Sequence, residues 1–154
     1  IAALTSLSSA PKYFVFLAPL MAETLCKCSM VVCASCGDSR EGLGGMFVKN
    51  ADTRTSGIAA LLATIILLIA GLLLLPDQLE WIDMVLVVLA AVVASIFAGW
   101  YMAQLGMKHF GCVNGDIMGA TNEVARPIIL LVITAVLWLM LSPPWRPPGD
   151  KGPA

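Results

Sequence analysis

Long apolar runs constrain this chain more than any other feature of its sequence. Residues 57–75 and 84–107 contain no charged side chain. Each run is long enough to cross the hydrocarbon core of a bilayer, which takes roughly 20 helical residues. Residues 128–142 form a shorter run that Val124 and Ala125 can lengthen. We therefore expect at least three membrane-spanning helices.

A fourth apolar segment, residues 13–36, carries two charges. Glu23 and Lys27 are four residues apart, so they can pair on one face of a helix. Charged side chains in a membrane helix are expected to face the bundle interior or a polar site. The alternative is two shorter helices that break near Glu23. The length needed to span a membrane favours one polar-faced helix.

The composition agrees with a membrane protein. The chain is 59% hydrophobic and only 12% charged, about half the usual charged share of a soluble domain. A soluble domain of this size buries only about two-thirds of its chain surface, so it could not hide these side chains. We expect an all-α, polytopic integral membrane bundle: a single membrane domain over residues 1–154, surrounded by lipid, with about four transmembrane helices. The proline-rich tail, residues 145–154, is expected to be irregular.

The distribution of charge predicts an orientation. Basic residues occur in the loops at residues 37–56 and 108–126, whereas the loop at residues 76–83 is acidic and has no basic residue. Because loops rich in Lys and Arg stay in the cytoplasm, the two basic loops should meet on the cytoplasmic face of the cell membrane. The tail then falls outside, although it carries Arg146 and Lys151. The net charge of -1 gives no footprint for nucleic acid.

One polar stretch before the last apolar run could carry chemistry. If the chain is helical from Gly115 onward, Asp116 and Glu123 are seven residues apart and face the same way. Gly119 and Ala120 lie between them. Two carboxylates beside so little side-chain bulk could hold a hard cation such as Mg²⁺ while a diphosphate approaches the backbone.

Two other interpretations of this stretch involve no ligand. Gly115 and Gly119 form a G-x-x-x-G pattern, which more often packs helices together. Asp116 could instead cap a helix. The pair of acidic residues at a membrane boundary nevertheless favours function.

The first basic loop offers phosphate partners. Gly42 and Gly44 free the backbone for close approach to a ligand, and Arg40 and Lys49 can meet phosphate charge. Taken alone, this loop is more typical of a flexible connector with positive-inside charge than of a ligand site. His109, after the second strong span, is more often structural than a base.

The cysteines only superficially suggest zinc. Cys26, Cys28, Cys33 and Cys36 follow a C-x-C-x₄-C-x₂-C spacing. On a membrane helix they spread around its circumference rather than converge. We therefore expect them to behave as small apolar residues, reduced on a cytoplasmic face.

These residues also carry a family resemblance. The stretch from Gly111 to Glu123 resembles the C-terminal signature of the cobalamin synthases, or adenosylcobinamide-GDP ribazoletransferases: G-G-x-[TN]-G-D-x-[LM]-G-A-x-x-E. Cys112 stands where that family usually has a second glycine. Residues 39–44 resemble its arginine–glycine loop, and Lys27 falls at an often basic position. The resemblance covers nearly the whole chain.

The resemblance implies a membrane-bound transferase in the last steps of cobalamin biosynthesis. A hydroxyl of α-ribazole, or of its 5′-phosphate, would attack adenosylcobinamide-GDP and release GMP. Asp116 and Glu123 would be catalytic and would bind Mg²⁺, the expected cofactor. Which of the two acts as a base stays open. The residues implied to bind substrate are Lys27, Arg40, Gly42, Gly44, Asn114, Gly115 and Gly119.

The family's N-terminal aspartate-rich segment has no match here. We therefore expect a fragment, resembling the C-terminal three-fifths of a synthase, that alone could be inactive. The main alternative is a small ion-coupled transporter or channel subunit, with Glu23, Asp116 and Glu123 coupling to ions. Carboxylates near the midplane would favour transport, whereas these are expected at the cytoplasmic end of a span. A lipid phosphoalcohol transferase would need several aspartates, and a purely structural subunit would not explain the polar loops. The oligomeric state is left open.

Overall fold

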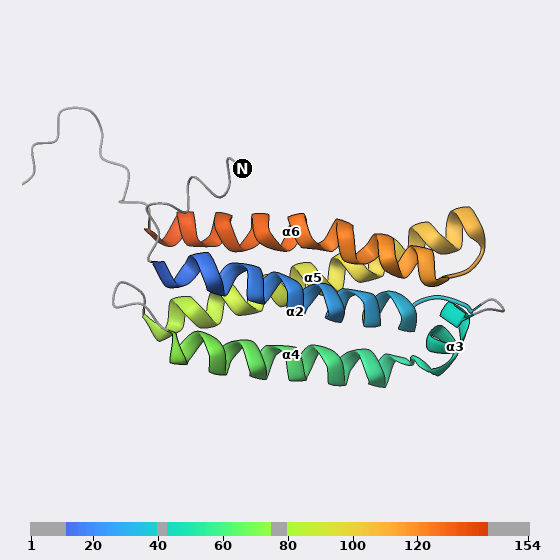
Figure 1. The fold of residues 1–154 in the computed structure, drawn as a ribbon, viewed down its shortest axis with the longest axis horizontal. Helices are drawn as coiled ribbons and strands as arrows, with labels where there is room; N and C mark the ends of the chain where they lie inside the picture. Colours follow the sequence, from blue (N-terminus) through green and yellow to red (C-terminus); the bar gives the residue numbers. More distant parts are fainter. Residues whose placement is uncertain (1–11, 40–42, 75–79, 142–154) are drawn as a thin grey trace, which may run out of the picture.

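The computed structural model describes residues 12–39, 43–74 and 80–141, and the long elements within them are helices. Successive long helices run in opposite directions and lie side by side in one bundle, with a short helix at one end (Figure 1). The all-α expectation is confirmed. The helices are α2 (Lys12–Ser35), α3 (Leu43–Asn50), α4 (Thr53–Leu73), α5 (Trp81–Phe110) and α6 (Gly115–Leu141).

Four of these helices are long and apolar enough to cross a membrane, as the sequence predicted. The first candidate span, Phe16–Ser35, is one continuous helix that contains both Glu23 and Lys27. The prediction of one polar-faced helix is therefore right, and the alternative of two shorter helices is wrong. Pro19 lies inside α2 without ending it.

Two boundaries differ from the sequence prediction. The last span begins at Gly115 rather than near residue 128, because the Asn114 side chain accepts a hydrogen bond from the Ile117 amide at 3.0 Å and starts the helix early. The first basic loop is also not a plain connector, since α3 occupies part of it. The tail at residues 145–154 and Ser142 lie outside the described residues.

The core centres on α2, which packs against α4, α5 and α6. Small residues let α2 approach α5 closely: a Cβ added to Gly99 would meet the Ser29 carbonyl oxygen, and would lie 2.9 Å from the Val32 Cβ. Beside this contact the Ser29 and Ser95 hydroxyl oxygens are 3.0 Å apart, and Ser95 donates to the Leu25 carbonyl at 2.8 Å. Both hydroxyl groups of this serine pair are thereby hydrogen-bonded.

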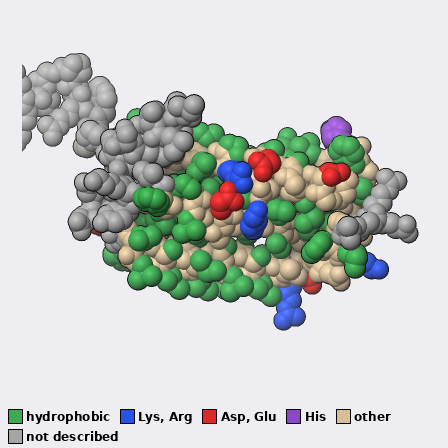
Figure 2. Space-filling model, viewed as in Figure 1, with side chains coloured by type: hydrophobic (Ala, Val, Ile, Leu, Met, Phe, Trp, Pro, Cys, Tyr) green, Lys and Arg blue, Asp and Glu red, His purple; other side chains and the backbone are tan. Residues whose placement is uncertain are grey.

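Apolar side chains cover the outside of the bundle (Figure 2). On α4 and α5 they are large and well exposed, as expected of surfaces that face lipid. Cys26, Cys28 and Cys33 are buried, while Cys36 is exposed. The first three therefore pack as small apolar residues, as predicted.

Candidate functional site

The two predicted polar loops are joined at one end of the bundle. The Val113 amide donates to the Asp38 carbonyl at 2.9 Å, and Ser39 and Val113 form a parallel bridge. Gly111 ends α5 in the left-handed region, with φ of 69°, a conformation that favours glycine. Cys112 needs no such conformation, because its φ is negative. The expectation that both loops share one face is confirmed.

A small apolar cluster beneath the loops holds this junction together. Its buried members come from α2, α3, α5, α6 and the loop between α5 and α6, and they are separate from the main core. They are Cys33, Ala34, Val48, Ala103, Val113 and Ile117. The loop end of the bundle is therefore packed from several elements at once, which positions the polar side chains above it.

Gly44 and Gly115 bring α3 against the start of α6. A Cβ added to Gly44 would meet the Gly115 amide nitrogen and lie 2.8 Å from its Cα. The two glycines, predicted to offer backbone to a ligand, lie against each other and pack one loop closely on the other. Their part in substrate binding stays a prediction.

This contact predicts an asymmetric response to substitution. The Cβ added by Gly44→Ala would push the α3 backbone away from the backbone of α6 at Gly115. We therefore expect the free energy of unfolding to fall by about 1–3 kcal/mol. Gly115→Ala is the matched control, because its Cβ would lie 3.8 Å from the Gly44 Cα, an ordinary contact. Thermal unfolding in detergent measures both. Equal stability of the two variants would contradict this account of the loop junction.

Asp116 lies in the first turn of α6, in an open cavity. The cavity has a volume of about 660 Å³ between α5 and α6, and His109, Asn114 and Ala120 also line it. Asn114 caps the helix, so the alternative that Asp116 is the cap is wrong. The Asp116 carboxylate is exposed and favourably placed at a positive helix N-terminus.

Gly119 leaves bare backbone on the exposed side of α6. A Cβ added at Gly119 would meet nothing within 4 Å. At about 100° per residue, Gly119 lies between Asp116 on one side and Met118 and Asn122 on the other. Among the predicted binding glycines in the described part of the chain, Gly119 has the most room above its backbone, since Gly115 has the Gly44 Cα at 3.8 Å and Gly44 packs against Gly115.

Glu123 belongs to a charged cluster between α2 and α6 rather than to the Asp116 cavity. Arg126 pairs with Glu23 at 2.8 Å and with Glu123 at 3.3 Å. Lys27 donates to the Asn122 side-chain oxygen at 2.9 Å. The predicted pairing of Glu23 with Lys27 is therefore wrong, because α6 supplies a better partner to each.

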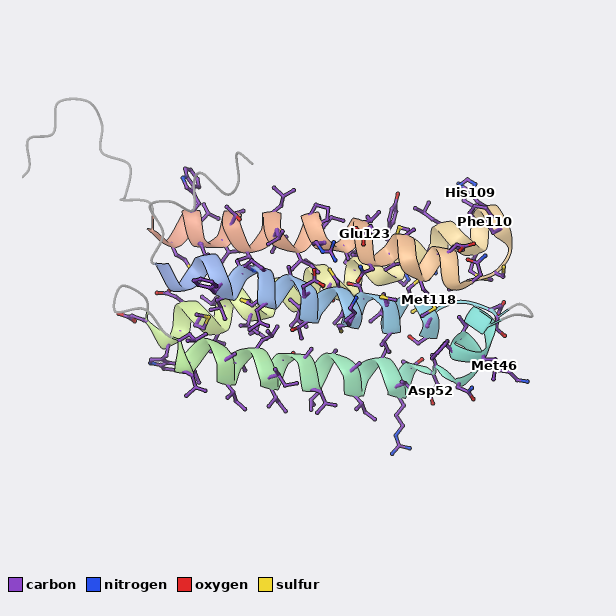
Figure 3. All side chains as sticks on the ribbon, viewed as in Figure 1. Met46, Asp52, His109, Phe110, Met118 and Glu123 are labelled. Atoms are coloured by element: carbon purple, nitrogen blue, oxygen red, sulfur yellow. The ribbon has the colours of Figure 1, made fainter. Side chains whose placement is uncertain are left out.

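The cluster lies within the candidate spans. Figure 2 shows its acidic and basic side chains together near the middle of an apolar face, and Figure 3 shows Glu123 farther along the bundle than His109 and Phe110. The prediction that Glu123 lies at the end of a span is corrected by the early start of α6. Charged side chains within a span are costly when they face lipid. The side of the bundle that carries this cluster is therefore expected to contact water, a ligand or another protein.

A sequence signal for this cluster existed. Glu23 and Lys27 on α2 are four residues apart, and so are Asn122 and Arg126 on α6. Two helices with polar residues at the same spacing can pair twice across one seam. The arrangement explains why each member of the α2 pair has its own partner on α6.

The described residues do not by themselves complete a metal site. Among residues 12–39, 43–74 and 80–141, no three His, Cys, Asp or Glu side chains come together. Asp116 and Glu123 have different neighbours, the cavity at α5 and the charged cluster at α2. Asp116 can still serve as a single oxygen ligand, because Mg²⁺ commonly takes one or two carboxylates together with substrate phosphates. Arg40 and Gly42 lie outside the described residues.

Asp52 caps the start of α4 at the same loop end. Its carboxylate accepts hydrogen bonds from the Thr55 amide at 2.7 Å and hydroxyl at 2.8 Å. These bonds, the amide one first, lower the pKa of Asp52. The stabilisation is therefore present above the unfolded value of about 3.9 and is lost as the pH falls through the lower folded value. The cap stays charged near neutral pH.

The chain is similar to known proteins of one kind. A family model described as cobalamin-5-phosphate synthase matches residues 1–134. Adenosylcobinamide-GDP ribazoletransferase of Methanocella arvoryzae is 28% identical over 130 residues, which cover 82% of this chain and 48% of the relative. The enzyme of the same name from Pyrococcus furiosus is 29% identical over 128 residues, covering 83% and 50%. That from Methanococcoides burtonii is 27% identical over 120 residues, covering 77% and 39%.

The chain thus spans about half the length, or less, of these relatives. No solved structure matches it. The family match covers the loop junction, the Asp116 cavity and the charged cluster, since all of these lie within residues 1–134.

Proposed function

The chain belongs to the cobalamin-5-phosphate synthase family, and on that premise we propose that it serves to join adenosylcobinamide-GDP to α-ribazole or α-ribazole 5′-phosphate. The resemblance of residues 111–123 to the family signature agrees with this membership. The observation that carries the proposal is Asp116, exposed in a cavity at the start of α6 within the matched region.

The reaction exchanges a phosphoanhydride bond for a phosphoester bond. A ribazole hydroxyl oxygen bonds to the cobinamide-side phosphorus, the bridging P–O bond of the diphosphate breaks, and GMP leaves with the bonding electron pair. The hydroxyl proton goes to a base. Such a transfer needs positioning and charge neutralisation more than covalent help. We assign Asp116 to orient the hydroxyl and accept its proton, and the bare backbone at Gly119 to let the phosphates approach.

Magnesium is part of the proposal. A Mg²⁺ ion bound through the substrate diphosphate would neutralise charge on the transferring phosphoryl group. Asp116 is the described residue that would bind it. Glu123 is given a different role, because with Glu23 it holds Arg126, while Asn122 holds Lys27, so that both cations lie beside α6. Arg40, Gly42 and Lys49 remain proposed phosphate partners from the first basic loop.

The transporter alternative has no support among the relatives, whose names are all those of transferases. Within the bundle, Glu23 and Glu123 are paired with Arg126. Carboxylates fixed in this way serve as structural charges rather than as exchangeable ion ligands. The apolar outer faces of α4 and α5 are proposed to contact lipid.

Complementation tests the proposed function. A bacterial strain without its own ribazoletransferase should regain cobalamin-dependent growth when it expresses this protein, and its extract should contain cobalamin by mass spectrometry. Growth restored without cobalamin in the extract, or restored equally by the Asp116→Asn variant, would contradict the proposal. The Asp116→Asn variant, expressed to the same level, controls for effects of the membrane protein itself.

The site is proposed to face the cytoplasm, and chemical labelling of a native cysteine can test this orientation. Cys36 is exposed at the loop end, while the other four cysteines of the chain are buried. A membrane-impermeant maleimide should therefore label Cys36 in inside-out vesicles and spare it in intact cells. Cys36→Ser should abolish the labelling. Labelling of intact cells that disappears in the Cys36→Ser variant would reverse the proposed orientation.

A further inference from the structure

A second cavity lies on the other side of α6, and nothing in the proposed reaction yet uses it. It has a volume of about 710 Å³ and is formed between α2, α3, the start of α4 and α6. That volume is within the range of about 300–1,000 Å³ typical of sites for small organic ligands. Figure 3 shows two of its residues, Met118 on α6 and Met46 on α3, toward the loop end of the bundle.

The lining of this cavity is apolar and adaptable, with one charge. Met30, Met46 and Met118 contribute thioethers and Phe47 an aromatic ring. Methionine sulfur and aromatic rings pack favourably on a flat aromatic group. Among the described residues that line the cavity, Lys27 is the only charged one. The lining therefore fits a flat apolar ring that carries an anionic group.

The depth of Lys27 distinguishes a soluble ligand from a lipid. Lys27 precedes the end of α2 at Ser35 by eight residues, or about 12 Å of helix. With Ser35 at the membrane surface, lipid phosphates would lie about that far beyond Lys27, so an anion at Lys27 would have to be brought in by the ligand itself. Only one of the three Lys27 protons is used by Asn122, which leaves two for a phosphate.

From these observations we propose that this cavity binds the acceptor nucleoside, with its aromatic base among the methionines and its 5′-phosphate on Lys27. The inference rests on the proposed function, which supplies a benzimidazole nucleoside as the acceptor. The ribose crosses α6 at Gly119, where there is room above the backbone, and its reacting hydroxyl reaches Asp116 on the far side. The cobinamide nucleotide then occupies the Asp116 cavity, so the two substrates approach the same helix from opposite sides.

Filling the cavity tests this assignment. Val31 lines it from α2, and Val31→Phe adds bulk where the base is placed. Val93→Phe is the matched control, because Val93 is 66% exposed on the outer face of α5. Equilibrium dialysis of purified protein against α-ribazole should show binding weakened roughly tenfold or more by Val31→Phe and unchanged by Val93→Phe. Equal binding by all three proteins would overturn the proposal.

The Lys27→Gln variant tests the binding of the phosphate independently of the binding of the aromatic base. Glutamine can still donate hydrogen bonds, but it carries no charge. We expect roughly tenfold weaker binding of α-ribazole 5′-phosphate and little change for the nucleoside. Loss of both ligands to the same extent would contradict the placement of the phosphate.

The binding measurement does not depend on turnover, so this proposal and the proposed function can fail separately. Normal transferase activity with a normal KM for α-ribazole in Val31→Phe would overturn the cavity assignment and leave the function standing. A raised KM for adenosylcobinamide-GDP instead would give the cavity to the other substrate. Native mass spectrometry that finds a phospholipid lost specifically from Val31→Phe, with nucleoside binding intact, would make the cavity a lipid site and overturn the proposal.

Discussion

Asp116→Asn should lower the rate of transfer about 100-fold or more while leaving the fold intact. Removal of a group that accepts a proton in the transition state typically costs a factor of about 10² to 10⁴. Asparagine keeps the size of the side chain, and Asp116 lies exposed in an open cavity. The loss should appear in kcat at saturating concentrations of both substrates, measured as GMP release.

The matched control is Asp83→Asn. Asp83 also lies in the first turn of a long helix, but at the opposite end of the bundle, where its carboxylate accepts a hydrogen bond from the Glu80 amide at 3.1 Å. Both substitutions remove one negative charge from a helix N-terminus, worth about 0.3–1 kcal/mol. Asp83→Asn should therefore keep near-normal turnover. Near-normal turnover of Asp116→Asn would end the catalytic assignment of Asp116.

Gly119→Leu should abolish most activity without harming stability. The added side chain begins in open space, since its Cβ meets nothing within 4 Å, and leucine favours a helix by up to about 1 kcal/mol over glycine. The melting temperature should stay level or rise. In the complex, the same side chain occupies the space assigned to the ribose and phosphates, and a displacement of about 1 Å can cost about 10²-fold in rate.

Gly57→Leu is the control for this substitution. Gly57 lies near the loop end of α4, and a Cβ there also meets nothing within 4 Å. The variant should match the wild type in rate, and its melting temperature should likewise stay level or rise. Full activity of Gly119→Leu would show that no substrate passes over this part of α6.

Much of this fold could be predicted because lipid enforces simple rules. Unbroken apolar runs indicated the spans. The excess of basic residues in both polar loops predicted that the loops lie on the same side of the membrane, and in the structure the Asp38–Val113 hydrogen bond joins them. The start of α6 was left open because residues 115–126 mix small, polar and apolar side chains, whereas the Asn114 cap shows where the helix begins. Helix α3 was not predicted because the glycines at residues 44 and 45 disfavour a helix when the sequence is considered alone. The contact of α3 with the start of α6 stabilises it in the structure.

The site was predicted in part. The face shared by Asp116 and Gly119 follows from helical spacing, so it could be read from the sequence. The place of Glu123 in a charged cluster could not, because Arg126 ties it to Glu23 on a distant helix. The packing of α3 on the start of α6 is likewise a contact between segments far apart in the chain. The spacing of residues in the sequence shows which side chains share a face of one helix. It does not show which helices contact each other, and these features depend on such contacts.

The most direct test of the central claim is GMP release by the purified protein in nanodiscs, with adenosylcobinamide-GDP and Mg²⁺ present, before and after α-ribazole is added. We expect no release before the addition, and afterwards one GMP for each cobalamin or cobalamin phosphate formed. GMP release that does not require the ribazole, or GMP formed without an equal amount of cobalamin product, would contradict the proposed transfer.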